Sequence, residues 1–130
     1  LLHQKEEPGQ QQDYVQLFQK AQSALKQKHY DETIKICDLL IDDYEQRALN
    51  AFILKTKALR GQDKLESALN TIKTALHASQ NYDLLYLEQA YIYHALANYN
   101  GLQTALENYF KHCSNNPQWD LLSLLSPKGV

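Results

Sequence analysis

The side chains that could bind a metal or act as nucleophiles are scattered along this sequence. No two histidines stand three or four residues apart, the spacing that places two imidazoles on one helical face as in the HExxH motif. The histidines are His3, His29, His77, His94 and His112. No Ser, Thr or Cys stands in a nucleophile-elbow or comparable catalytic signature. We therefore expect no metal site, no cofactor and no enzymatic activity.

The cysteines and the paired acids also have structural interpretations. Cys37 and Cys113 are far apart and outside any CxxC or Cys/His cluster, so we expect both to be small buried apolar residues. Acidic pairs such as Asp31-Glu32 and Asp42-Asp43 fall at expected helix ends. There they complement the helix dipole or lie on the solvated surface.

Tyrosine is the aromatic residue in excess, with nine Tyr against three Phe and one Trp. Tyr91 does not stand at a large packing position of the helical pattern, unlike the other tyrosines around it. It is three residues before His94 and shares a helical face with Leu87. An exposed Tyr offers an apolar ring with a polar tip, which protein interfaces favour. This face is therefore a candidate partner-binding surface.

Composition narrows the class of protein that could position these residues. The chain has 130 residues, the size of one domain, and a formal net charge of −2, without the basic excess typical of nucleic-acid binders. Between Gln10 and Asn116 there is no proline, and Gly61 and Gly101 are the only glycines. This spacing excludes turn-rich β folds and glycine-rich phosphate loops.

The sequence also lacks the segments that direct a chain into or across a membrane. No run of about 18 apolar residues is present, so we expect no membrane insertion. The first residues, Leu1-Leu2-His3, do not form the apolar core of a signal peptide, and a cytoplasmic location is favoured. The absence of Met suggests a processed chain or a fragment.

Apolar residues at steps of three and four predict a series of helices joined by short polar breaks. The expected helices span residues 13–25, 31–44, 46–60, 64–78, 83–97 and 101–113, with a short last helix over 118–125. Asp13 and Asp83 are the expected N-caps of the first and fifth helices. Gly61 is expected to end the third helix in the left-handed conformation. The last helix is expected to bury Trp119, Leu122 and Leu125.

The helices repeat in pairs. The turns align on Tyr30, Leu65 and Tyr99, which are 35 and 34 residues apart. The stretch KQKHYDETIKICDLLID (26–42) resembles the turn and second helix of a tetratricopeptide repeat, which has a period of about 34 residues. Tyr30 matches the aromatic residue that opens the second helix, and Thr33 its small residue. The family's turn glycine is absent here, where Lys28 stands.

The resemblance implies an all-α fold: an α-solenoid of three antiparallel helix pairs with a short C-terminal capping helix. The implied domain spans 13–126, with repeats at about 14–45, 46–80 and 82–114 and the cap at 118–125. Residues 1–12 are expected to be a flexible lead-in and 127–130 a tail. The implied function is a non-catalytic scaffold or adaptor that binds a peptide or helix of a partner protein in its concave groove.

The same resemblance assigns candidate groove residues in the first helix of each pair. They are Phe18, Gln22, Lys26, Ile53, Lys57, Arg60, Leu87, Tyr91 and His94. Members that clamp chaperone carboxylates need Lys, Asn or Arg donors in all three first helices. Here Gln19 and Gln22 stand in the first, and residues 83–97 contain no Lys or Arg. We therefore expect no Hsp70/Hsp90-type carboxylate clamp, and instead a peptide with apolar anchors.

Two further functions are compatible with the sequence. The chain could be a secretion-type or assembly chaperone that keeps one client soluble. It could also be part of a longer structural solenoid, in which the helix at Trp119 would open the next repeat. The identity of the partner and the oligomeric state stay open.

Overall fold

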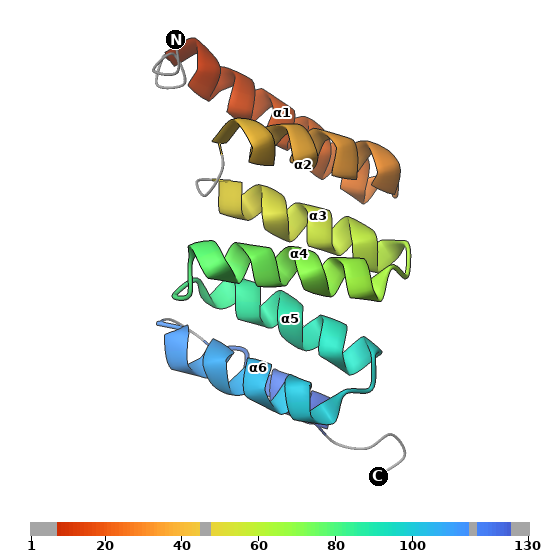
Figure 1. The fold of residues 1–130 in the computed structure, drawn as a ribbon, viewed down its shortest axis with the longest axis vertical. Coiled ribbons are helices and arrows are strands. Elements are labelled where there is room, and N and C mark those ends of the chain that lie inside the picture. The colour runs from red at the N-terminus through yellow and green to blue at the C-terminus, as the bar shows by residue number, and fades with distance from the viewer. Residues whose placement is uncertain (1–7, 45–47, 115–116, 126–130) are drawn as a thin grey trace.

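The computed structural model describes residues 8–44, 48–114 and 117–125, and in this part of the chain all regular structure is helical. The elements are α1 (Pro8–Lys26), α2 (Tyr30–Tyr44), α3 (Leu49–Gly61), α4 (Leu65–Ala78), α5 (Asp83–Ala95), α6 (Tyr99–His112) and the 3₁₀-helix η3 (Trp119–Leu125). Each helix packs against the next in the chain, and the stack follows chain order along its long axis (Figure 1). The expected all-α class is confirmed for the described residues.

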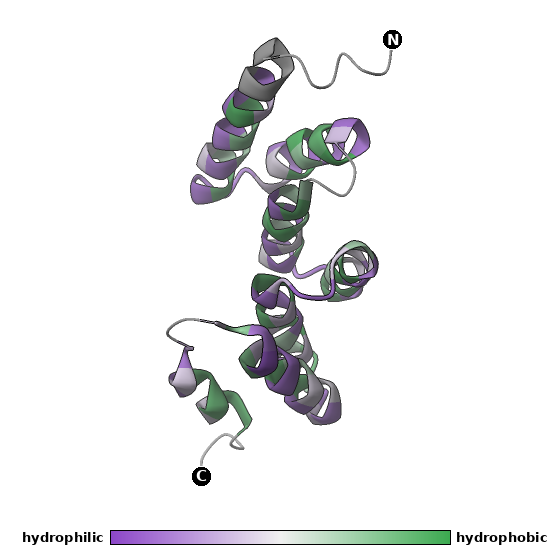
Figure 2. Cartoon of the chain, turned by 90° about the vertical axis from the view of Figure 1, so that its left-hand side faces the viewer, coloured by the Kyte–Doolittle hydropathy of each residue, from purple (hydrophilic) through white to green (hydrophobic). Residues whose placement is uncertain are grey.

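The helices form three hairpins, α1–α2, α3–α4 and α5–α6, and the first helices of successive hairpins also touch. Besides the contacts between sequence neighbours, α1 contacts α3 and α3 contacts α5. The segment η3 packs on α6 and lies beside it at the C-terminal end of the stack (Figure 2). Residues from α3 and α5 are therefore direct neighbours although a whole helix separates them in sequence.

The first helix begins earlier than the apolar pattern predicts. It starts at Pro8, so Asp13 lies inside the helix and does not cap it, and residues 8–12 are helical where a flexible lead-in was expected. Proline suits a first helical position because the N–H that it lacks has no partner within the helix there. Residues 1–7 and the expected tail at 127–130 lie outside the described residues.

The three hairpin turns share one backbone geometry. Lys28, Asp63 and Ala97 have φ of 64°, 61° and 57°, the left-handed conformation, and they are spaced like the repeat. The next residue in each turn donates its N–H to the carbonyl five residues earlier: His29 to Ala24 (2.8 Å), Lys64 to Leu59 (2.8 Å) and Asn98 to Tyr93 (2.9 Å). This is the Schellman motif that ends helices. We expected Gly61 to take the left-handed conformation at the end of α3. This prediction is wrong, because Asp63 takes that conformation.

The two central glycines are instead required by close packing against tyrosine rings. A Cβ at Gly61 would collide with the ring of Tyr30, from the preceding hairpin. A Cβ at Gly101 would come within 2.7 Å of the ring of Tyr93 in the same hairpin. Only a residue without a side chain lets these rings lie on the helix backbone.

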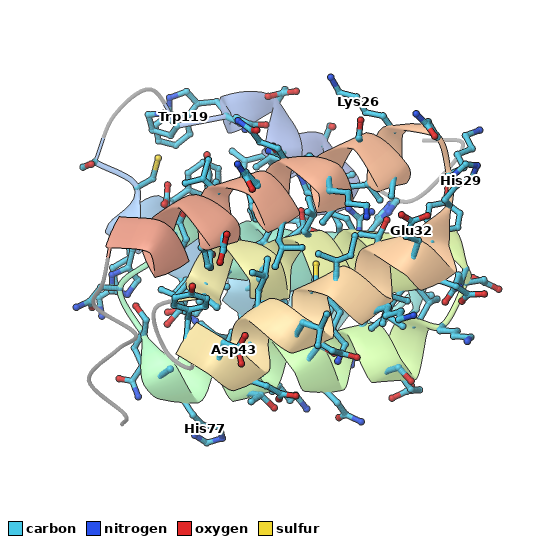
Figure 3. All side chains as sticks on the ribbon, turned by 90° about the horizontal axis from the view of Figure 1, so that it is seen from above. Lys26, His29, Glu32, Asp43, His77 and Trp119 are labelled. Atoms are coloured by element: carbon cyan, nitrogen blue, oxygen red, sulfur yellow. The ribbon has the colours of Figure 1, made fainter. Side chains whose placement is uncertain are left out.

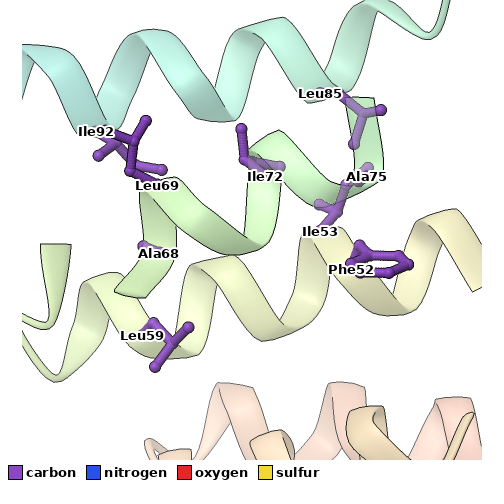
Figure 4. Close-up of a cluster of buried hydrophobic side chains, with 9 residues drawn as sticks. All are labelled: Phe52, Ile53, Leu59, Ala68, Leu69, Ile72, Ala75, Leu85 and Ile92. Atoms are coloured by element: carbon purple, nitrogen blue, oxygen red, sulfur yellow. The ribbon is translucent and has the colours of Figure 1, made fainter. Parts of the chain in front are cut away.

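The core consists of three clusters that follow one another along the stack. The central one joins α3, α4 and α5 (Figure 4) and comprises Phe52, Ile53, Leu59, Ala68, Leu69, Ile72, Ala75, Leu85 and Ile92. Each cluster combines side chains of different helices, so no hairpin buries its apolar residues alone. This is the packing expected of stacked helical repeats.

The capping segment buries a different face from the one expected. Leu121 is 4% exposed and packs into the cluster of α5 and α6, whereas Trp119 and Leu122 are 62% and 47% exposed. A 3₁₀-helix has three residues per turn, so Leu121 and Leu124 lie on one side and Trp119 and Leu122 on another. Leu125, which was also expected to be buried, is partly buried against the same cluster. The N–H of Gln118 donates to the Tyr109 hydroxyl at 3.2 Å and helps to hold the segment on α6.

The expected N-cap of α5 is also wrong. Asp83 is the first residue of α5, and the N-cap is Tyr82, whose side chain makes no capping hydrogen bond.

Candidate partner-binding surface

The surface with a distinctive charge arrangement lies where α3 contacts α5. Lys57 and Arg60 are three residues apart on α3, and Glu88 and Tyr91 are three residues apart on α5. Residues at this spacing share one face of a helix. We call these four residues the α3–α5 cluster.

The members of the α3–α5 cluster are joined by direct contacts. Arg60 donates from Nε and Nη2 to Oε1 of Glu88, at 3.2 and 3.0 Å. Lys57 Nζ is 4.0 Å from the other carboxylate oxygen, Oε2. The guanidinium carbon of Arg60 lies 5.1 Å from the centroid of the Tyr91 ring, within cation–π range. The arginine is thus held from two sides by α5.

Glu88 is a buried carboxylate, 3% exposed. Burial raises its pKa, and this effect outweighs the lowering by the nearby charges of Arg60 and Lys57 and by the Arg60 hydrogen bond. Burying the negative charge therefore costs more free energy than the two cations return. The equivalent positions in the other hairpins, one repeat and two repeats earlier, hold Leu54 and Gln19. The stack can be built with an uncharged residue at this position.

The exposed side of the cluster is positive. The side chains of Lys57 and Arg60 are 45% and 30% exposed, and that of Glu88 only 4%. Two cations thus face one carboxylate, and solvent reaches the cations. In a chain with a net charge of −2, this excess is local.

The candidate residues expected in the groove differ in exposure. Gln22, Lys26, Lys57 and His94 are exposed, and Phe18, Arg60 and Tyr91 are half-buried. Ile53 and Leu87 are buried, at 8% and 7% exposure, so they belong to the core and are not exposed on the binding surface. The reason is that both face neighbouring helices in the core clusters.

The structure brings Lys57, Arg60 and Tyr91 together through Glu88 and the contact of Arg60 with the tyrosine ring. Phe18 stacks on Tyr14 within α1, with ring centroids 6.1 Å apart. Figure 3 places Lys26 and Trp119 at one edge of the stack, seen from above, and His77 at the opposite edge. Sequence reasoning missed Glu88. The signal available was a lone charged residue in the stretch from Leu84 to Ile92, where Gln89 is the one other residue that is neither apolar nor aromatic.

Other chemically active groups of the described residues have local structural roles. Cys37 is fully buried, and burial raises its pKa to about 12, so its thiol is protonated at neutral pH. Cys113 is only partly buried, with Sγ 3.7 Å from the Tyr109 hydroxyl. The described ranges contain no group of three His, Cys, Asp or Glu side chains placed to hold a metal ion.

Within the same ranges, no helix has the length and hydrophobicity needed to cross a membrane. In comparisons with known proteins, no family model matches this sequence and no curated protein is significantly similar to it.

Proposed function

We propose that this chain is a tetratricopeptide-like α-solenoid that acts as a non-catalytic scaffold or adaptor. It binds a segment of a partner protein on the face formed by its first helices, α1, α3 and α5. The observation that carries this proposal is the α3–α5 cluster, in which the buried carboxylate of Glu88 pairs with Lys57 and Arg60, and the guanidinium of Arg60 lies over the Tyr91 ring. A buried carboxylate whose pKa is raised by burial marks a functional-site candidate, and the equivalent positions of the other hairpins, Leu54 and Gln19, carry no charge.

The repeated geometry supports the solenoid part of the proposal. The left-handed turn residues recur at the period of the family, and the first helices of successive hairpins contact one another. Gln22, Lys57 and Tyr91 stand at equivalent positions of the three hairpins, 35 and 34 residues apart. In such a stack, equivalent positions follow one another along a continuous surface, which suits an extended or helical segment.

The test compares the proteins retained by the wild-type chain with those retained by a Lys57→Ala/Tyr91→Ala variant, using quantitative mass spectrometry. Lys73→Ala is the matched control. Lys73 is exposed on α4, one turn before His77, which Figure 3 places at the edge opposite Lys26. We expect a set of proteins that the wild type and the Lys73→Ala control retain and that the double variant does not.

Far-UV circular dichroism and thermal melting establish that the wild type and both variants are folded. If the folded double variant retains the same proteins as the wild type, the first-helix face is not the binding surface and the proposal fails.

A further inference from the structure

The cations of the α3–α5 cluster keep hydrogen-bonding capacity after their contacts with Glu88. Arg60 uses Nε and Nη2 for Glu88, and its Nη1 has no hydrogen-bond partner among the described residues. Lys57 Nζ, at 4.0 Å from Oε2, is farther than the roughly 2.7–3.2 Å of an N–H···O bond. Two positively charged donor groups on one face of α3 are thus open to a further acceptor.

We propose that these donors bind an acidic side chain of the partner segment, so that one partner carboxylate bridges Lys57 Nζ and Arg60 Nη1. This inference rests on the proposed function and names the chemistry of the partner: an acidic stretch of polypeptide, with the carboxylate inside the chain and not at its C-terminus. Charge complementarity is the argument for this occupant, since the cluster carries two cations, one carboxylate and an exposed positive side.

Glu88 prepares the site for such a partner by restricting the arginine. The guanidinium is fixed between the Glu88 carboxylate and the Tyr91 ring before any partner arrives. A long side chain that is already ordered loses less conformational entropy on binding. The donors of arginine are arranged in a rigid planar fork, so that Nε and Nη2 bind Oε1 of Glu88 while Nη1 remains for the partner. A leucine, as at the equivalent position Leu54, would leave the arginine held only by its contact with the Tyr91 ring.

The experiment uses the full chain and a phage-displayed library of random peptides as the probe. The library is selected separately on the wild type, on Lys57→Gln/Arg60→Gln, and on Lys73→Gln, which removes the same charge from the exposed side of α4. Enriched peptides are sequenced, and their affinities for all three proteins are measured by fluorescence anisotropy at low and high NaCl.

The expected result is that peptides enriched on the wild type and on Lys73→Gln contain Asp or Glu. Their affinity falls by about tenfold or more on Lys57→Gln/Arg60→Gln, as for other close interfacial charge pairs, and decreases with salt. Replacing the peptide's acidic residue by its amide has the same effect, whereas amidating its C-terminus has little.

Three outcomes of the peptide experiment overturn the inference in distinguishable ways. If the enriched peptides bind Lys57→Gln/Arg60→Gln as well as the wild type, but bind the Lys57→Ala/Tyr91→Ala variant of the earlier test more weakly, the partner is not recognised by charge, although the proposed function survives. If no enriched peptide depends on any residue of the first-helix face, both proposals fail. Binding of inorganic phosphate that displaces the peptides at equal strength also contradicts recognition of a polypeptide.

Removing Arg60 alone leaves a buried carboxylate with a weaker counter-charge, which could unfold the chain. The variant Lys57→Gln/Arg60→Gln/Glu88→Gln avoids this, because it neutralises both sides of the buried pair. We expect this triple variant to lose affinity for the acidic peptides to the same extent as Lys57→Gln/Arg60→Gln. Retained binding by this folded triple variant overturns the inference.

Discussion

At the scale of single residues, the buried carboxylate of Glu88 makes a prediction about stability and pH. Its pKa is raised because burial outweighs the compensation by Arg60 and Lys57. A folded state with a raised carboxyl pKa binds protons more readily than the unfolded state does. Stability from this group is therefore greatest at acid pH and decreases as pH rises from the unfolded pKa, about 4.3, through the folded one.

Glu88→Gln removes this pH dependence while keeping an oxygen that accepts from Arg60. Relative to the wild type, we expect the variant to gain stability as the pH rises from about 4 to 7, by about 1.4 kcal/mol for each unit by which folding raises the pKa. The measurement is urea denaturation across this pH range. Glu66→Gln, the same substitution at an exposed position of α4, corrects for the general loss of a carboxylate. A difference that stays constant with pH, or runs the other way, contradicts the assignment.

At the level of the helices, the hairpin turns hold non-glycine residues in a left-handed conformation that glycine adopts without strain. Ala97 has φ of 57°, a conformation that costs an L-residue roughly 1–2 kcal/mol, whereas Asp63 occupies the equivalent position with a side chain that tolerates it better. The turns are therefore determined by the packing of the two helices and not by local preference.

Ala97→Gly relieves this strain, and we expect it to raise the free energy of unfolding by about 1 kcal/mol. Asp63→Gly should have a smaller effect. Ala95→Gly is the control, because Ala95 is exposed and still within α5, where glycine costs helix stability. Urea denaturation measures the free energy of unfolding of the three variants, from which their order of stability follows. If Ala97→Gly destabilises as Ala95→Gly does, the left-handed turn is not present in solution.

The segment η3 provides a second comparison at this scale, between neighbouring leucines. Leu121 is 4% exposed in the cluster of α5 and α6, and Leu122 is 47% exposed. We expect Leu121→Ala to lower stability by about 2 kcal/mol, as for other buried leucines, and Leu122→Ala by less than about 0.5 kcal/mol. Thermal or urea unfolding distinguishes them. The reverse order would support the face predicted from sequence, with Trp119 and Leu122 inward.

At the largest scale, the described helices form a linear stack, so stability depends on how many neighbours each helix has. The central cluster joins α3, α4 and α5, and α3 also contacts α1 and α2. The end elements α1 and η3 have neighbours on one side of the stack (Figure 1). In repeat proteins, local opening begins where contacts are fewest.

Native-state hydrogen exchange should therefore show a gradient along the chain. We expect the amides of α3, α4 and α5 to be the slowest and those of η3 and of the N-terminal part of α1 to exchange at least about tenfold faster, because each 1.4 kcal/mol of opening free energy is a factor of ten. Hydrogen–deuterium exchange followed by peptide-resolved mass spectrometry measures the exchange rate of each helix. Equal protection of all elements would mean that the stack opens only as one unit, which contradicts the gradient.

The sequence by itself determined the helical class, most helix positions and the spacing of the hairpins, because apolar periodicity and polar breaks are local properties. It also singled out Lys57, Arg60 and Tyr91. Only the tertiary structure revealed the buried Glu88 between them, since α3 and α5 touch across an intervening helix. It likewise decided that Ile53 and Leu87 are buried and that η3 turns Leu121 inward. Periodicity defines the faces of a helix, but which face is covered depends on the helices packed against it.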